Sequence, residues 1–352
     1  MQSFNVLGIM SGTSIDGLDL ALCNFSSKKG LWKYEILKCN IIKYDKLLKK
    51  RLFDAHNLGA FELQVLDFEF GKIIANEVNA FLAETSVKVD FISSHGHTIF
   101  HSPQNGVSYQ IGNGNVIAKE TGLPVVYDFR SGDIALGGQG APLVPIGDEL
   151  LFGDFSACLN LGGFSNISYK NNENQRIAYD ICPMNIVLNR FAKMLNLEFD
   201  DKGKIAASGN TNIELLNKLN DLDYYKQQYP KSLGREWVDD IFMNVVKDVQ
   251  NLKIEDILNT LTVHFAEQIS NNLKNSKNVL VTGGGAFNEF LIDNIRKNTV
   301  AEIIIPNNEL INYKEAIIFA FLGLLRFLNK INCLSSVTGA KRNSCCGIVA
   351  SY

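Results

Sequence analysis

The apolar and polar positions at the start of the chain predict two strands joined by a polar turn. Residues 4–10 are largely apolar, residues 11–14 read Ser-Gly-Thr-Ser, and leucine occupies every second position in residues 18–22. A short apolar run and a strict alternation are both typical of strands, and small polar residues between them are typical of turns. We therefore predict a hairpin at the N-terminus.

The same order of features returns about half the chain later. Residues 157–169 hold an apolar run, a pair of glycines and a second alternating run. Such an internal echo predicts a duplicated α/β unit with a boundary near Gly153, with chance similarity as the alternative. We expect one domain to comprise residues 1–153 and a returning segment at about 313–352, and the other to comprise residues 154–312.

Each predicted hairpin is followed by a segment whose apolar residues have helical spacing and then by a further predicted strand. Apolar residues recur every three or four positions in residues 66–82 and again in residues 261–273, and apolar strands follow at 89–93 and 278–281. Residues 314–328 are apolar nearly all round, which predicts a buried helix. Alternating strands and helices favour a layered α/β fold.

Composition narrows the function classes. The 352 residues suit two domains, each able to bury a core, and 46% of them are hydrophobic. A net charge of -3 without a long basic block gives no general attraction to nucleic acid or to an anionic membrane. The most apolar segment, residues 317–325, is shorter than the roughly 20 residues that cross a bilayer. We expect small-molecule partners.

The cysteines and the N-terminus favour a cytoplasmic location. The seven cysteines are odd in number, scattered and without a CxxC pair, which favours reduced thiols over a disulfide framework or a zinc site. Residues 1–10 lack the basic start and uninterrupted apolar stretch of a signal peptide.

The first turn has the residue types of a phosphate site. Glycines let the backbone approach an anion, hydroxyls and N–H groups hold phosphate oxygens, and an aspartate can bind Mg²⁺ through water. An ordinary hairpin turn is the alternative, and the spacing is not that of a P-loop. The candidates are Gly12, Thr13, Ser14, Asp16, Gly17 and Asp19, with Asp16 as the Mg²⁺ ligand.

Two further glycine turns could bind the same nucleotide. The second lies in the matching position of the other half, and the third follows a strand and precedes a predicted helix at 289–296, where an N-terminus can face a phosphate. The third turn does not fit a dinucleotide fingerprint, because its last glycine is replaced by Asn288. The candidates are Gly162, Gly163, Ser165, Asn166, Gly283, Gly284, Gly285 and Asn288.

Asp180 is the candidate general base. It follows a short predicted strand at 177–179 and precedes a proline-containing turn, so its carboxylate could point into a cleft. Taken alone, an aspartate here is also typical of a helix N-cap.

Polar residues elsewhere could bind substrate. His95, His97 and Thr98 lie in a histidine-rich segment that we predict to be a loop at a strand end. We prefer substrate hydrogen bonding over zinc ligation for it because no carboxylate or cysteine ligand set lies nearby. Arg130 could hold an anionic group with its planar fork, or could form a structural pair with an aspartate. Asp128 and Gln139 flank it on either side.

Six segments taken together resemble the anhydro-N-acetylmuramic acid kinase family. They occur in order at residues 10–19, 94–99, 128–130, 137–145, 160–166 and 282–286. The resemblance implies the two-domain, actin-like ATPase (ribonuclease H-like) fold with duplicated mixed sheets and an interdomain cleft. It also implies ATP and Mg²⁺ as cofactors, a homodimer, and an enzyme that opens the 1,6-anhydro ring while phosphorylating O6.

The resemblance also assigns roles. It implies that residues 12–19 form the first phosphate loop, residues 160–166 the second and residues 283–288 the adenosine-side turn. Asp180 would be the base, with Arg130 assisting and Asn185 among the substrate contacts.

The chain departs from the family pattern at two places. Residues 181–184 read Ile-Cys-Pro-Met where the family commonly has glycines, and His97 stands where glutamine is usual. The first departure leaves open a kinase for another amino sugar, and the fold alone leaves open an actin-like or chaperone-like ATPase.

Overall fold

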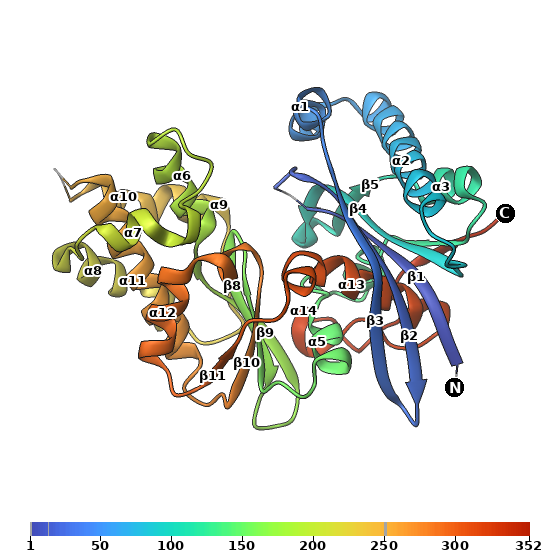
Figure 1. Cartoon of the computed structure of the whole chain (residues 1–352). Helices are drawn as coiled ribbons and strands as arrows, with labels where there is room; N and C mark the ends of the chain where they lie inside the picture. Colours follow the sequence, from blue (N-terminus) through green and yellow to red (C-terminus); the bar gives the residue numbers. More distant parts are fainter. Residues whose placement is uncertain (1, 13, 250–251) are drawn as a thin grey trace. The chain divides into compact units, whose positions relative to one another are not determined.

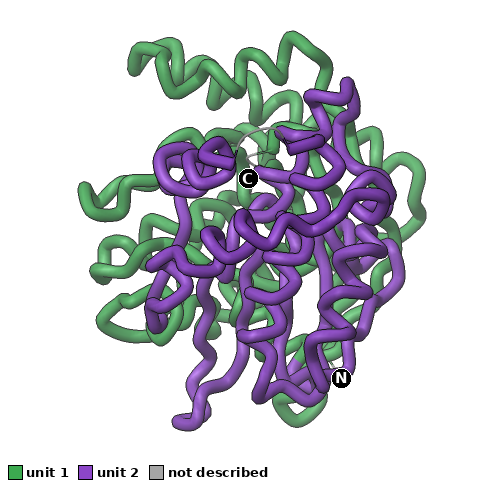
Figure 2. Tube along the Cα trace, turned by 90° about the vertical axis from the view of Figure 1, so that its left-hand side faces the viewer, with its two compact units in different colours: residues 1–152, 313–352 green, residues 153–312 purple. Residues whose placement is uncertain are grey.

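The computed structural model describes residues 2–12, 14–249 and 252–352. They form two compact units, coloured separately in Figure 2. Unit 1 comprises Met1–Phe152 and Tyr313–Tyr352, and unit 2 comprises Gly153–Asn312.

Unit 1 contains a seven-stranded mixed sheet (Figure 1). Its first three strands are antiparallel neighbours in the order β3, β2, β1, and β4 and β6 continue the sheet parallel to β1. β12 closes one edge, and β5 pairs with β4. The strands are β1 (Gln2–Ser11), β2 (Gly17–Lys28), β3 (Leu31–Lys43), β4 (Phe91–Ser102), β5 (Val107–Ile111), β6 (Val125–Tyr127) and β12 (Ile348–Ala350).

Unit 2 repeats this plan in a five-stranded sheet. Its order is β9, β8, β7, β10, β11, in which the first three strands are antiparallel neighbours and the last two run parallel to β7. The two sheets therefore share one topology, which confirms the duplication predicted from the internal echo. The strands are β7 (Ala157–Leu161), β8 (Phe164–Lys170), β9 (Arg176–Pro183), β10 (Asn278–Thr282) and β11 (Glu302–Ile304).

Helices cover both faces of the unit 1 sheet. The apolar side of α2 packs on the inner leucines of β1 and β2 in one core cluster. On the other face α13 lies so close to β1 that a Cβ on Gly8 would fall 2.1 Å from the carbonyl oxygen of Ala316. The helices are α1 (Lys46–Asp54), α2 (Ala60–Ala83), α3 (Gly114–Thr121), α4 (Ser131–Ala135), α5 (Pro145–Leu151), α13 (Asn308–Phe327) and α14 (Ser335–Thr338).

The core of unit 2 joins its sheet to α6, α8, α11 and α12. Asparagines begin two of these helices: the side chain of Asn212 accepts a hydrogen bond from Leu215 N, and that of Asn288 accepts one from Leu291 N. The helices are α6 (Asn185–Met194), α7 (Lys204–Ser208), α8 (Ile213–Asn220), α9 (Arg235–Trp237), α10 (Met243–Lys247), α11 (Ile254–Asn272) and α12 (Glu289–Asn298).

Most predicted elements are confirmed, and two are corrected. The terminal hairpin, its echo, the helices at 66–82, 261–273 and 289–296 and the buried helix at 314–328 all form. The histidine-rich segment is not a loop, because β4 continues to Ser102. Asp180 lies inside β9 rather than after its end, because the strand runs on to Pro183. In the described part of the chain no helix has the length and apolar character needed to cross a membrane.

Candidate active site

The first glycine turn joins β1 to β2 in unit 1. Gly12 and Ser14–Asp16 connect the strands, with Ile15 N donating to the Gly12 carbonyl at 3.1 Å. The predicted site residue Thr13 lies outside the described residues. Ser14 and Asp16 are exposed, whereas Gly17 is buried where β2 meets β3, and a Cβ there would fall 2.5 Å from the Ile42 carbonyl oxygen.

Carboxylates gather beside this turn. The pKa of Asp19 is raised to about 7, mainly by burial and to a smaller extent by the negative charges of Glu315 and Asp16. Asp19 is the partner of Met10 in the β1–β2 register, and Glu315 is an exposed residue of α13. Sequence reasoning missed Glu315. The signal that could have found it is a carboxylate at position 315, within the segment 314–328 that is predicted as a buried apolar helix.

Arg130 is held by neutral acceptors. Its Nε and Nη2 lie 3.1 and 2.7 Å from His95 Nε2, and its Nη1 donates to the Gly140 carbonyl at 2.6 Å. Neither Asp128 nor Asp133 forms an ion pair with it in the described part of the chain, so the structural Arg–Asp pair considered above is wrong. Burial lowers the pKa of Arg130 and the negative charge of Glu315 opposes that shift, so the acidic group that acts on Arg130 is Glu315 rather than an aspartate.

His95 supports Arg130 instead of facing a substrate. Its Nδ1 lies 3.0 Å from the Gly96 carbonyl oxygen, so Nδ1 carries the proton and Nε2 accepts from Arg130. Burial and the Arg130 charge hold the His95 pKa well below its ordinary value, which keeps the ring neutral. Because both ring nitrogens are used, we reassign His95 from substrate binding to the positioning of Arg130.

A β-bulge at Gly96 separates the two histidines. Gly96 has a φ of 73°, and the β1–β4 register shifts there. The His95 ring lies 4.6 Å from Phe319 of α13, whereas the His97 ring lies 6.3 Å from Phe70 of α2. The two imidazoles therefore face opposite sides of the sheet, which rules out their joint ligation of one metal ion.

His97 belongs to a buried hydrogen-bond chain. Tyr44 donates to Ser11 Oγ at 2.8 Å, and Ser11 Oγ lies 3.0 Å from His97 Nδ1. This chain ties the last residue of β1, directly before the glycine turn, to β4 and to the residue after β3. His97 thus holds the turn in place.

The remaining unit 1 candidates lie on the strands and loops nearby. Thr98 Oγ1 accepts from Gln110, and Asp128, with a φ of 52°, accepts from Ser131 N at 3.2 Å. Gln139 is exposed, and its backbone N–H donates to Thr338 at 2.9 Å.

Unit 2 brings the second and third glycine turns together. β10 pairs with β7 so that Thr282 lies opposite Asn160, at the ends where both turns begin. A Cβ on Gly283 would fall 2.6 Å from Asn160 Oδ1, and one on Gly285 would fall 2.8 Å from Leu161 Cβ. Only glycine allows this approach, and Gly283 also has a φ of 82°. Gly163 and Gly284 remain exposed.

The N-terminus of α6 joins the same turns. Asn185 N donates to the Gly162 carbonyl at 3.3 Å, and its Nδ2 donates to the Leu161 carbonyl at 3.4 Å. The N-cap position belongs to Met184, so the N-cap alternative for Asp180 is wrong.

Asp180 stands beside the second turn. In the β8–β9 register it is the partner of Asn166. Its Oδ2 accepts from Leu233 N at 2.9 Å, while its Oδ1 has no partner among the described residues. Burial raises the pKa of Asp180, and the Leu233 hydrogen bond lowers it in part. A half-buried carboxylate with one oxygen fixed and one unoccupied is suited to accept a proton.

Two side chains that were predicted to bind the nucleotide form other interactions in the structure. The Ser165 hydroxyl is fully buried and lies 3.1 Å from Cys182 Sγ, and the Asn288 side chain caps α12. These side chains are therefore structural, and only their backbones remain near the turns.

The departure at residues 181–184 lies in the core. Ile181, Cys182 and Met184 are fully buried in the unit 2 cluster. The substituted side chains fill the interior under Asp180 instead of facing solvent. The departure from the family pattern therefore gives no reason to expect a different amino sugar as the substrate.

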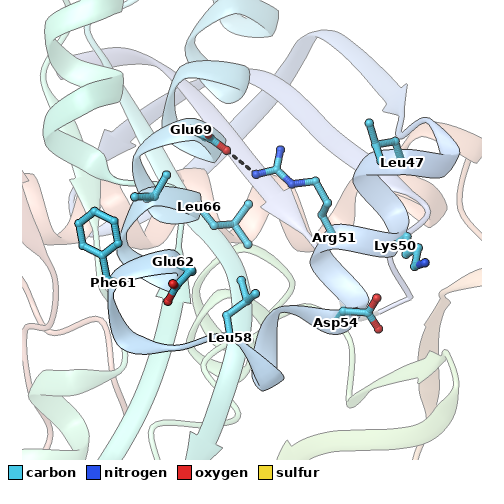
Figure 3. Close-up of a pocket in the computed structure, with 10 residues that line it drawn as sticks. Leu47, Lys50, Arg51, Asp54, Leu58, Phe61, Glu62, Leu66 and Glu69 are labelled. Carbon is cyan, nitrogen blue, oxygen red and sulfur yellow. Dashed lines mark hydrogen bonds and ion pairs between the residues drawn. The ribbon is translucent and has the colours of Figure 1, made fainter.

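A cavity of about 580 Å³ lies elsewhere, between α1 and α2 (Figure 3). Leu58, Phe61 and Leu66 line it together with an Arg51–Glu69 ion pair. None of the predicted site residues takes part in it.

Two copies of one mixed sheet, each with a glycine turn between its first two strands, define the class of duplicated ribonuclease H-like proteins to which many sugar kinases belong. The sequence model of the family "Anhydro-N-acetylmuramic acid kinase" matches residues 4–351. The chain belongs to this family.

The chain is also similar to curated relatives and to solved structures. A protein of that name from Francisella tularensis subsp. novicida is 38% identical over 367 residues, covering 95% of each chain. One from Sulfurimonas denitrificans is 35% identical over 368 residues, covering 97% of this chain and 98% of the relative. The activator of 2-hydroxyisocaproyl-CoA dehydratase from Clostridium difficile is a similar structure, with a TM-score of 0.45, 12% identity and coverage of 90% and 94%.

Proposed function

We propose that this protein is an ATP-dependent kinase that opens the 1,6-anhydro ring of anhydro-N-acetylmuramic acid with water and phosphorylates O6. The product is N-acetylmuramic acid 6-phosphate. The observation that carries the proposal is the family match over residues 4–351. The proposal includes a cytoplasmic location and a homodimer.

Asp180 acts as the general base in this proposal. Its unoccupied Oδ1 takes a proton from water, which attacks C1 of the sugar while the bond from C1 to the bridging oxygen breaks. The released O6 accepts the γ-phosphoryl group of ATP, and ADP leaves. The raised pKa of Asp180 supports this role because a more basic carboxylate accepts a proton more readily.

The glycine turns bind the nucleotide. In unit 2 the exposed backbones of Gly163 and Gly284 lie on adjoining turns that can accommodate phosphates and adenosine. In unit 1 the Gly12–Asp16 turn contributes N–H groups and the Ser14 hydroxyl. Phosphoryl transfer depends mainly on alignment and charge neutralisation, to which Arg130 contributes its positive charge.

The carboxylates of unit 1 fit a Mg²⁺ ion. The negative charges of Glu315 and Asp16 both act on Asp19, and a divalent cation would relieve such repulsion. No three His, Cys, Asp or Glu side chains of the described residues could hold a metal ion alone. Mg²⁺ commonly binds one or two carboxylates together with phosphates and water, so Asp16 is the proposed protein ligand and the ion would supply charge neutralisation.

The test is incubation of the protein with Mg-ATP and a panel of amino sugars, followed by measurement of ADP. We expect ADP release that depends on anhydro-N-acetylmuramic acid. Turnover with a different sugar would support the kinase for another amino sugar. ATP hydrolysis unaffected by every sugar would support the actin-like or chaperone-like ATPase.

A further inference from the structure

The segment 227–234 of unit 2 passes beside the proposed base. β9 is the edge strand of its sheet, so this segment can reach residues on both of its faces. Leu233 N donates to Asp180 Oδ2 at 2.9 Å, and two residues earlier the segment carries Lys231. The position of Lys231 is therefore tied to that of Asp180.

Lys231 lies over two tyrosines. Its Nζ is 4.6 Å from the centre of the Tyr224 ring and 5.7 Å from that of Tyr179, and it donates to the Tyr224 carbonyl at 3.4 Å. Tyr224 in turn donates through its hydroxyl to the Asp180 carbonyl at 2.6 Å. Two aromatic faces and one carbonyl fix the ammonium group in place.

The ammonium group has no acidic partner in the described part of the chain. Lys314, the buried lysine of unit 1, pairs with Asp148 at 2.6 Å, but no carboxylate lies within ion-pair distance of Lys231. Burial lowers the pKa of Lys231, so an anion that compensates the charge would bind favourably there. A cation held rigidly and left unpaired beside a reaction site is suited to recognise an anionic substrate.

We propose that Lys231 binds the carboxylate of the substrate's lactyl group. This inference rests on the proposed function, in which the substrate is a sugar acid. The 1,6-anhydro bridge reacts at Asp180, and the lactyl ether is attached at C3, across the sugar ring from the bridge. Lys231 and Asp180, joined through Tyr224 and Leu233, then hold the two ends of one substrate.

The experiment compares Lys231→Met with the wild type on two substrates. These are anhydro-N-acetylmuramic acid and its methyl ester, which has the same shape without the charge. A hydrogen bond to a charged group contributes about 1.5–3 kcal/mol, or roughly 10- to 150-fold. We expect kcat/KM for the acid to fall about 30-fold in the variant, mostly through KM, with kcat/KM for the ester and KM for ATP unchanged.

Two variants serve as controls. Lys231→Arg should restore part of the activity on the acid, and Lys226→Met, an exposed lysine paired with Asp221 and Asp223, should match the wild type. Equal losses on acid and ester would overturn the proposal, since they indicate a structural role. A raised KM for ATP would overturn it in favour of a phosphate contact.

Calorimetric titration of acid and ester separates this inference from the proposed function. If the wild type binds the acid through Lys231 but forms no phosphorylated product, the proposed function fails and the inference stands. If the wild type phosphorylates the acid and Lys231→Met binds acid and ester as the wild type does, the inference fails and the function stands.

Discussion

The β1–β2 turn of unit 1 and the β7–β8 turn of unit 2 occupy the same place in one repeated topology but carry different chemistry. The first spans residues 12–16 and is accompanied by carboxylates, Asp16 on the turn and Asp19 on the next strand. The second consists of Gly162 and Gly163 alone. Its carboxylate, Asp180, lies instead on the third strand, opposite Asn166.

The third strands differ accordingly. In unit 1 the β3 residue opposite Asp19 is Ile41, so no acid faces that turn from β3. In unit 2 the acid is on β9, buried enough for its pKa to rise and fixed by one hydrogen bond. The two sheets thus share one strand order, and the positions of their acidic residues differ. Asp16 and Asp19 make the unit 1 turn suited to cations and phosphates, whereas Asp180 makes the unit 2 turn suited to proton transfer.

The largest expected effect is on Asp180. In Asp180→Asn the proposed base cannot accept a proton, so we expect turnover to fall by at least ~100-fold while ATP affinity and the melting temperature stay near those of the wild type. Steady-state kinetics and ATP titration measure this. Asp239→Asn, which removes a surface ion pair with Arg190, is the matched control and should keep its activity. Wild-type rates in Asp180→Asn would refute the contrast between the two turns.

Asp16 tests the cation side of the comparison. In Asp16→Asn the proposed Mg²⁺ ligand is weakened, so the Mg²⁺ concentration for half-maximal rate should rise about 10-fold. Magnesium titrations of the rate measure this, with Glu173→Gln on the exposed β8–β9 turn as control. An unchanged titration would remove Asp16 from the metal site.

A substitution at Gly283 tests how closely the two glycine turns of unit 2 must approach each other. Gly283→Ala adds both a left-handed φ penalty and a contact at 2.6 Å with Asn160, so we expect a loss of about 3 kcal/mol in the free energy of unfolding. Gly122 has a φ of 69°, but an added Cβ would lie in open space, so Gly122→Ala should lower the free energy of unfolding by only about 1 kcal/mol. Denaturant unfolding measures both. Equal losses would show that close packing of the turns is not required.

Asp19 gives the smallest expected effect, one that depends on pH. Its folded pKa of about 7 lies above the ordinary value of 3.8, so its contribution to stability is fully present below pH 3.8 and is lost as pH rises through 7. Asp19→Asn removes this loss, and we expect its melting temperature to exceed that of the wild type by about 3 °C at pH 8 and by less at pH 5. A gain independent of pH would contradict the assigned cause.

Periodicity predicted the strands and helices because their apolar faces repeat locally. It did not predict the full length of β9, because Asp180 interrupts the apolar pattern while edge pairing with β8 carries the strand through it. The contact between His95 and Arg130 joins residues 35 positions apart, and only the fold can reveal it. The glycine turns could be recognised as motifs in the sequence. The structural roles of Ser165 and His95 could not, because they depend on contacts with Cys182 and Arg130, which are distant in the sequence.

The most direct test of the account is mass analysis of the product formed from anhydro-N-acetylmuramic acid and Mg-ATP in heavy-oxygen water, quenched promptly. The proposed mechanism predicts one heavy oxygen per sugar phosphate, located on C1, with none in the phosphoryl group. Heavy oxygen found only in inorganic phosphate, with no sugar phosphate formed, would contradict it.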